Sequence, residues 1–126
     1  MIKFLPGRHV IDSFGNGGFR FGGMSHQGSL LVLPSGMQAC AAKTVAEITE
    51  EDLTLIIAEK SAIDFLLIGT GVDMHHLRSG LDKILKSEAI HADIMSTNAA
   101  VRTYNVILAE QRRVAALMIA VDKAHG

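Results

Sequence analysis

The chain has 126 residues, of which 48% are hydrophobic and 20% are charged, and its formal net charge is −1. This length is typical of one domain that buries roughly two-thirds of the surface of its unfolded form, so we expect a single domain over residues 1–126. The composition argues against disorder, and the absence of a basic excess argues against nucleic acid as a partner.

The cysteine content and the amino terminus bear on the location of the protein. Cys40 is the only cysteine, so no internal disulfide can form, and this fits a reducing compartment. Residues 1–8 have neither the apolar core nor the cleavage site of a signal peptide, and no apolar run reaches the roughly 18–20 residues of a spanning helix. We therefore predict a soluble cytoplasmic protein with no membrane span, which leaves peripheral association with a membrane open.

Residues 11–46 are predicted to form an antiparallel meander, because short apolar runs alternate with turn signals rich in glycine. Phe19 and Phe21 share one strand face and Arg20 points the other way, so one face of this sheet should be exposed to solvent. The expected strands cover residues 11–14, 19–21, 29–33 and 38–42.

From residue 49 the pattern changes to alternating helices and strands. Thr49 is an N-cap followed by three acidic residues, which complement the positive end of a helix. The run Phe65 to Ile68 is apolar without alternation, which predicts a strand covered on both faces. Because helices separate the strands, we predict a parallel βαβαβ unit with right-handed crossovers. The expected helices cover about residues 50–59, 76–86 and the part of 96–113 that follows a cap at Ser96 or Thr97, and the expected strands cover 65–68, 92–95 and 114–121.

The helix predicted within residues 96–113 has an apolar stripe and a polar strip. Asn98, Arg102 and Asn105 line one side, and Glu110 is placed to pair with Arg113. The polar strip is either a solvated face with an ion pair of little value, or a binding surface for a partner or an anionic ligand, since Arg presents a planar fork of donors. The apolar stripe consists of Ala100, Val101, Tyr104, Ile107 and Leu108, at helical spacing.

Gly69-Thr70-Gly71 lies at the carboxyl end of a predicted buried strand, where open α/β sheets bind ligands. As a motif it is incomplete, because a dinucleotide fingerprint needs a third glycine where Met74 stands, and no phosphate-loop Lys-Ser or Lys-Thr follows. The first interpretation is a tight turn. The second is a ligand-binding crevice between this turn and Ser96-Thr97-Asn98.

The histidine pair and the cysteine are weaker candidates for a functional site. His75 and His76 are neighbours in sequence and do not share a helix face, so they cannot chelate a metal at the usual i, i+4 spacing. Cys40 lies between alanines in an apolar strand, which is typical of an inert core thiol. We therefore predict no catalytic residue, no metal site and no cofactor.

Two stretches, Phe65 to Gly71 and Met95 to Val114, resemble a small domain family of unknown biochemical function. This family includes the mitochondrial complex I assembly factor 3 and the adipogenesis-associated domain-containing proteins. The resemblance covers most of the chain and rests on the spacing from Gly-Thr-Gly to Thr-x-x-Ala-x-Arg-Thr-Tyr-Asn to Glu-x-Arg-x-Val. Family members commonly have a proline shortly after the Gly-x-Gly turn, whereas this chain has Met74-His75-His76, so the start of the second helix is left open.

The resemblance implies a three-layer β/β/α fold of the α/β or α+β class, in which an N-terminal antiparallel meander packs on a mixed or parallel sheet with the helices on the outer face. It also implies that the relatives in the mitochondrial matrix, or at the inner-membrane face, are non-catalytic assembly factors. The candidate partners are peripheral-arm subunits of respiratory complex I, and the alternative is a small-molecule enzyme or sensor that uses the crevice at the ends of the parallel strands. The candidate partner- or ligand-binding residues are Gly69, Thr70, Gly71, Thr97, Asn98, Arg102, Asn105, Glu110 and Arg112.

Overall fold

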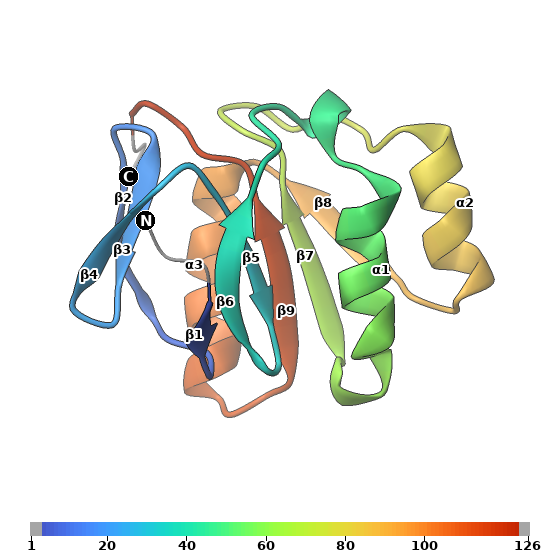
Figure 1. Cartoon of the computed structure of the whole chain (residues 1–126), viewed down its shortest axis with the longest axis horizontal. Coiled ribbons are helices and arrows are strands. Elements are labelled where there is room, and N and C mark those ends of the chain that lie inside the picture. The colour runs from blue at the N-terminus through green and yellow to red at the C-terminus, as the bar shows by residue number, and fades with distance from the viewer. Residues whose placement is uncertain (1–3, 124–126) are drawn as a thin grey trace.

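The structure, a computed structural model, describes residues 4–123 and arranges them in three layers (Figure 1). The strands are β1 (Leu5–Pro6), β2 (Ile11–Gly15), β3 (Gly18–Phe21), β4 (Met24–Gln27), β5 (Ser29–Leu33), β6 (Gly36–Cys40), β7 (Phe65–Gly69), β8 (Ala92–Met95) and β9 (Val114–Met118). The helices are α1 (Glu50–Ala58), α2 (Ser79–Ser87) and α3 (Thr97–Ala109), with short 3-10 turns η1 (Val45–Glu47) and η2 (Lys60–Ala62). A six-stranded sheet has the order β1-β6-β5-β9-β7-β8, and a three-stranded sheet has the order β2-β3-β4.

The centre of the large sheet is the parallel unit that the sequence predicts. β7 lies between β8 and β9 and runs parallel to both. Its residues Leu66, Leu67 and Ile68 are all buried, as expected for an apolar run that is covered on both faces. β9 then pairs antiparallel with β5, which joins the two halves of the chain in one sheet. The mixed α/β fold class is confirmed.

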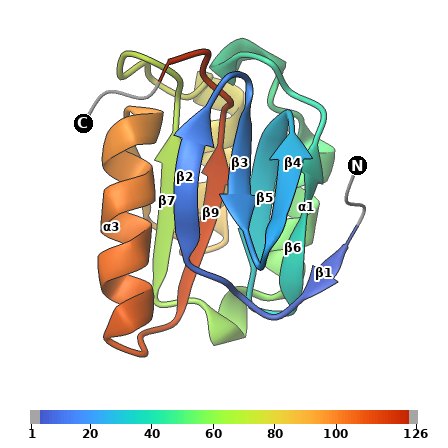
Figure 2. The ribbon, with the colours of Figure 1, turned by 90° about the vertical axis from the view of Figure 1, so that its left-hand side faces the viewer.

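The helices lie on both faces of the large sheet, which differs from the expected layout with all helices on one outer face. α1 and α2 cover one face, where Leu53 and Leu81 join one apolar cluster. α3 shares the other face with β2-β3-β4, where Tyr104 and Phe21 join a second cluster (Figure 2). The chain moves from β7 to β8 through α2 and returns past β7 to β9 through α3. Right-handed connections that run in opposite directions along a sheet must pass over opposite faces.

The predicted meander is divided between the two sheets. β5 and β6 pair within the large sheet, and β2, β3 and β4 form the small one. β4 is absent from the sequence-based expectation because its residues show no apolar alternation. It pairs with β3 through Gly22 and Gly23, whose φ angles of 58° and 75° suit the tight hairpin turn that requires two positive φ values. Phe19 and Phe21 are buried and Arg20 is exposed, as predicted.

The helix starts follow from local hydrogen bonds. At α1, Thr49 Oγ1 accepts from the main-chain N–H of Asp52 at 3.3 Å, and the Asp52 carboxylate accepts from the N–H of Thr49 at 2.9 Å. Ser96 Oγ accepts from Ala99 N–H at the start of α3. α2 begins at Ser79, three residues later than expected. In the loop before it, Thr70 Oγ1 donates to the Asp73 carbonyl and accepts from the His75 N–H.

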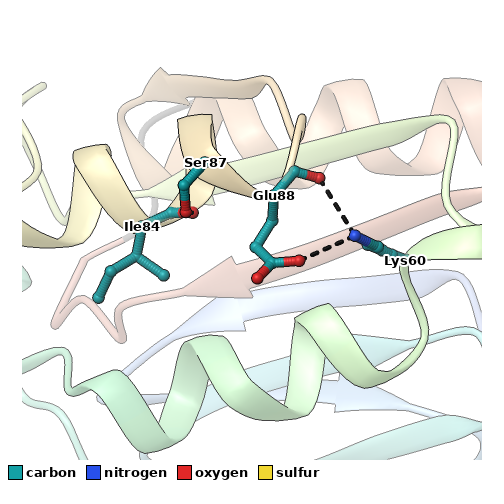
Figure 3. A network of polar contacts seen from close by, with 4 residues as sticks. All are labelled: Lys60, Ile84, Ser87 and Glu88. Atoms are coloured by element: carbon teal, nitrogen blue, oxygen red, sulfur yellow. Dashed lines mark hydrogen bonds and ion pairs between the residues drawn. The ribbon is translucent and has the colours of Figure 1, made fainter.

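One exposed contact joins the helices on the outer face (Figure 3). Lys60 Nζ, in η2, donates to Glu88 Oε1 at 2.8 Å, just beyond the end of α2. The two side chains are 47% and 37% exposed, and an ion pair this accessible contributes little to stability. The buried apolar residues of α1 and α2 therefore stabilise this layer.

Candidate functional site

The crevice predicted between the ends of β7 and β8 is closed by hydrogen bonds. Thr97 Oγ1 donates to the carbonyl of Ile119 at 2.6 Å and accepts from the N–H of Gly71 at 3.0 Å. The N–H of Thr97 donates to the Gly71 carbonyl at 2.8 Å. Thr97 has no exposed surface. Its hydroxyl therefore joins the turn after β7, the start of α3 and the end of β9, and its single proton is committed to that junction.

The Gly-Thr-Gly turn is built from similar contacts. Thr70 Oγ1 lies 2.7 Å from the carbonyl of Asp73, to which it donates, and accepts from the N–H of His75 at 3.0 Å. A Cβ atom on Gly69 would lie 3.0 Å from the Ala100 Cβ, so glycine at this position lets α3 pack closely on β7. Gly71 has a φ of 111°, which other residues rarely adopt. These three residues therefore make turn and packing contacts.

One residue of the polar strip of α3 is hydrogen-bonded within the protein, and another is exposed. Asn105 Oδ1 accepts from the N–H of Ile11 and its Nδ2 donates to the Ile11 carbonyl, each at 2.9 Å. The Asn105 amide thus occupies the place of a neighbouring strand beside β2. The next residue back, Tyr104, is fully buried, and its hydroxyl donates to the His9 carbonyl at 2.8 Å. Arg102 is exposed, so the spacing that groups it with Asn105 in the sequence does not give the two residues the same role.

The expected pairing of Glu110 with Arg113 is wrong. α3 ends at Ala109, and Gln111 has a φ of 59°, so residues 110 and 113 do not lie on one helix face. Arg113 instead forms a two-pronged contact with Asp64 at 3.0 and 2.8 Å, and this guanidinium lowers the pKa of the Asp64 carboxyl. Arg112 lies over the ring of Phe65, 5.0 Å from its centroid, and Glu110 is exposed.

The remaining candidates are metal-ligating side chains and the cysteine thiol. Within residues 4–123, no group of three or more His, Cys, Asp or Glu side chains could hold a metal ion. Cys40 is buried, and this burial raises the pKa of its thiol from 9.0 to about 11. The thiol is therefore protonated and unreactive at neutral pH, as expected for a core cysteine.

A cavity of about 950 Å³ opens beside the closed crevice, and of the predicted site residues only Thr70 and Gly71 line it. Its other walls come from the β2–β3 turn at Gly17, from the β4–β5 turn, from the end of β6 through to η1, and from the residues that follow β9. These segments lie far apart in the sequence. The run Ala39-Cys40-Ala41-Ala42 supplies small side chains, but nothing in it signals a cavity until the fold brings the other walls to it.

Comparison with known proteins places the chain in a family. Residues 11–119 match the family described as protein of unknown function (DUF498/DUF598). The chain belongs to this family. The match covers every strand but β1 and all three helices, and it confirms the resemblance drawn from the Gly-Thr-Gly turn and α3.

Several DUF498/DUF598 relatives are similar over most of their length. An uncharacterized protein of Rhodobacter capsulatus is 39% identical over 95% of this chain and 91% of its own. The NADH dehydrogenase (ubiquinone) 1 alpha subcomplex assembly factor 3 of Danio rerio is 29% identical over 94% of this chain and 68% of its own. A crystal structure described as an outer membrane protein from Bartonella henselae is 49% identical, with a TM-score of 0.87 over 92% of this chain and 98% of that one. In the described part of the present chain, every helix is too short or too polar to cross a membrane.

Proposed function

We propose that this chain is a cytoplasmic, non-catalytic protein-binding module that assists the assembly of a larger complex, with peripheral-arm subunits of a respiratory NADH dehydrogenase as its clients. The similarity to assembly factor 3 supports this class of function. The structural observation that carries the proposal is the outer face of α3, where an exposed arginine, which has no ion-pair partner among residues 4–123, lies beside exposed apolar side chains.

This surface is defined by Arg102, Val106 and Val10, and we call it the α3 face. Val106 is 59% exposed and lies one turn after Arg102 on the helix. Val10 is 48% exposed and precedes Ile11, whose main chain is bonded to Asn105. Two exposed apolar side chains therefore flank the contact between α3 and β2. Arginine beside apolar contact area is typical of residues that dominate protein interfaces.

The clamp between α3 and β2 suits this surface to binding. Asn105 bonds to Ile11 and Tyr104 bonds to His9, which are the two chain neighbours of Val10. The α3 face is therefore held in place before a partner binds, and binding does not have to order it. Asn98 at the start of the helix, and Glu110 and Arg112 beyond its end, extend the proposed surface. Gly69, Thr70, Gly71 and Thr97 then support α3 from beneath rather than contact the partner.

The experiment is recovery of partners by the tagged full chain, after cross-linking in its native cells. We expect the wild type to enrich peripheral-arm subunits of NADH dehydrogenase, and the double variant Arg102→Ala/Val106→Ser to lose them without a change in melting temperature. Both positions are exposed, so the variant should change stability by no more than about 0.5 kcal/mol.

The matched control is Glu51→Ala/Leu55→Ser, which removes a charged and an apolar side chain at the same spacing on the exposed face of α1. Leu55 is 41% exposed and Glu51 is also exposed. The control should recover the same subunits as the wild type. Absence of any stable partner of the wild type would reject the assembly function. Equal recovery by the wild type and the α3 variant would reject the α3 face alone.

A further inference from the structure

Several polar groups in the wall of the cavity beside the closed crevice already have hydrogen-bond partners within the protein. Ser29 Oγ accepts from the N–H of Ala120 at 2.9 Å, and the Thr70 hydroxyl is engaged within its own turn. The thiol of Cys40 is held protonated by burial. Within residues 4–123, the one buried side-chain nitrogen or oxygen without a partner is His26 Nδ1, and His26 does not line this cavity. A polar group of a ligand that entered the cavity would lose its hydrogen bonds with water and would find few partners to replace them.

Much of the surface inside the cavity is apolar. Ala41, Ala42 and Ile119 line it, and about 950 Å³ is open between the walls. This volume lies within the range of roughly 300–1,000 Å³ that small-molecule pockets occupy. Val72 stands at the wall and is 56% exposed, although it is apolar. An occupant that covers Val72 would remove apolar surface from water.

The charged groups around the cavity are mixed in sign. Lys43, His75 and Asp122 are the titratable side chains among its lining residues besides Cys40, and all three are exposed. Within residues 4–123, neither Lys43 nor Asp122 forms a salt bridge. The interior therefore matches an uncharged chain, while the edge presents one cation and one anion to a head group.

We propose that this cavity binds the apolar chain of a small amphipathic molecule, whose head group remains in water at the edge beside Lys43 and Asp122. This site is separate from the α3 face and does not depend on the proposed assembly function. The neutral interior selects an alkyl-like chain, and the mixed charges at the edge favour neither an anionic nor a cationic head group.

The test uses hexanol, octanol and decanol as probes, followed by amide chemical shifts and calorimetry on the full chain. Each added methylene that enters the cavity should tighten binding about fourfold, because a buried CH₂ is worth about 0.8 kcal/mol. Octanoate should bind within about fivefold of octanol, because exposed charge pairs contribute little. The shifts should concentrate at Ala41, Ala42 and Thr70.

Two pairs of variants locate the site. Val72→Asp puts a charge at the cavity wall, whereas Met74→Asp changes a residue of the same loop that is 50% exposed and does not line the cavity. Ala41→Trp narrows the cavity, whereas Ala46→Trp adds the same side chain to exposed surface outside it. Val72→Asp and Ala41→Trp should weaken decanol binding at least about tenfold, and each control should leave it unchanged.

The inference is overturned if no probe gives saturable shifts, if affinity does not rise along the alcohol series, or if both members of each pair behave alike. A variant that loses the dispersed amide spectrum of the wild type is set aside, and the other pair then decides. Partner recovery by the α3 face is measured separately, so failure here leaves the assembly proposal standing and the reverse also holds.

Discussion

Replacing Asn105 with alanine should destabilise the domain by about 2–3 kcal/mol. The change removes the two hydrogen bonds of 2.9 Å that join α3 to the main chain of Ile11. Each bond is worth about 0.5–1.5 kcal/mol, and a buried N–H or C=O left unpaired costs about 1–3 kcal/mol. Asn105 is partly buried, so water can reach part of the gap, and this places the loss below the sum of both penalties. It is still a large share of a total stability of about 5–15 kcal/mol.

The assay is urea unfolding followed by circular dichroism, together with amide hydrogen exchange at Ile11. Asn98→Ala is the matched control, because Asn98 is the same residue type on the same helix and is also partly buried. Among residues 4–123 its side chain takes part in no hydrogen bond, so its replacement should change stability by no more than about 0.5 kcal/mol. If Asn105→Ala unfolds like Asn98→Ala and Ile11 exchanges at the wild-type rate, Asn105 does not clamp β2.

Three further predictions follow from buried positions. Tyr104→Phe should lower the unfolding free energy by about 0.5–1.5 kcal/mol, because it removes the hydrogen bond to the His9 carbonyl. Tyr104→Ala should lower it by about 3–5 kcal/mol, because the ring is buried. Both values are read from urea midpoints, and equal midpoints for the two variants would contradict the burial of the ring. Gly69→Ala should lower the unfolding free energy by about 1–3 kcal/mol, because the added Cβ would push α3 away from β7. Gly80→Ala in α2 has open space around the new Cβ and should raise the unfolding free energy by up to about 1 kcal/mol. If both variants change the unfolding free energy in the same direction, the close approach of α3 is refuted. Unfolding free energy should fall as the pH rises above 9.0, because the folded chain keeps the proton of Cys40 up to about 11 and raises the pKa of Tyr104 above 10.0, while the unfolded chain releases both protons earlier. A flat pH profile between 8 and 11 in urea titrations would show that these groups are not buried as described.

The candidate binding residues show where sequence reasoning reaches its limit. Helical spacing places Asn98, Arg102 and Asn105 on one side of α3, and this is correct as local geometry. Whether such a side chain faces water depends on what the fold brings against it. Asn105 bonds to Ile11, which is 94 residues away, whereas the side chain of Arg102 is exposed and makes no such contact within residues 4–123. Helical periodicity describes only the helix itself, so one pattern covers two different roles.

The presence of three helices, the buried central strand and the cap at Thr49 were determined by the sequence alone, because each depends on residues within about one turn or one strand. The sequence narrowed the cap of α3 to Ser96 or Thr97, and the structure selects Ser96. The tertiary structure alone decided that α3 shares a face with the small sheet, that the meander divides between two sheets, and that Thr97 closes the crevice. Only the tertiary structure forms the cavity, whose walls come from five separate segments of the chain. These features depend on connection handedness and on contacts between segments distant in the chain, and no local pattern of residues encodes either of them.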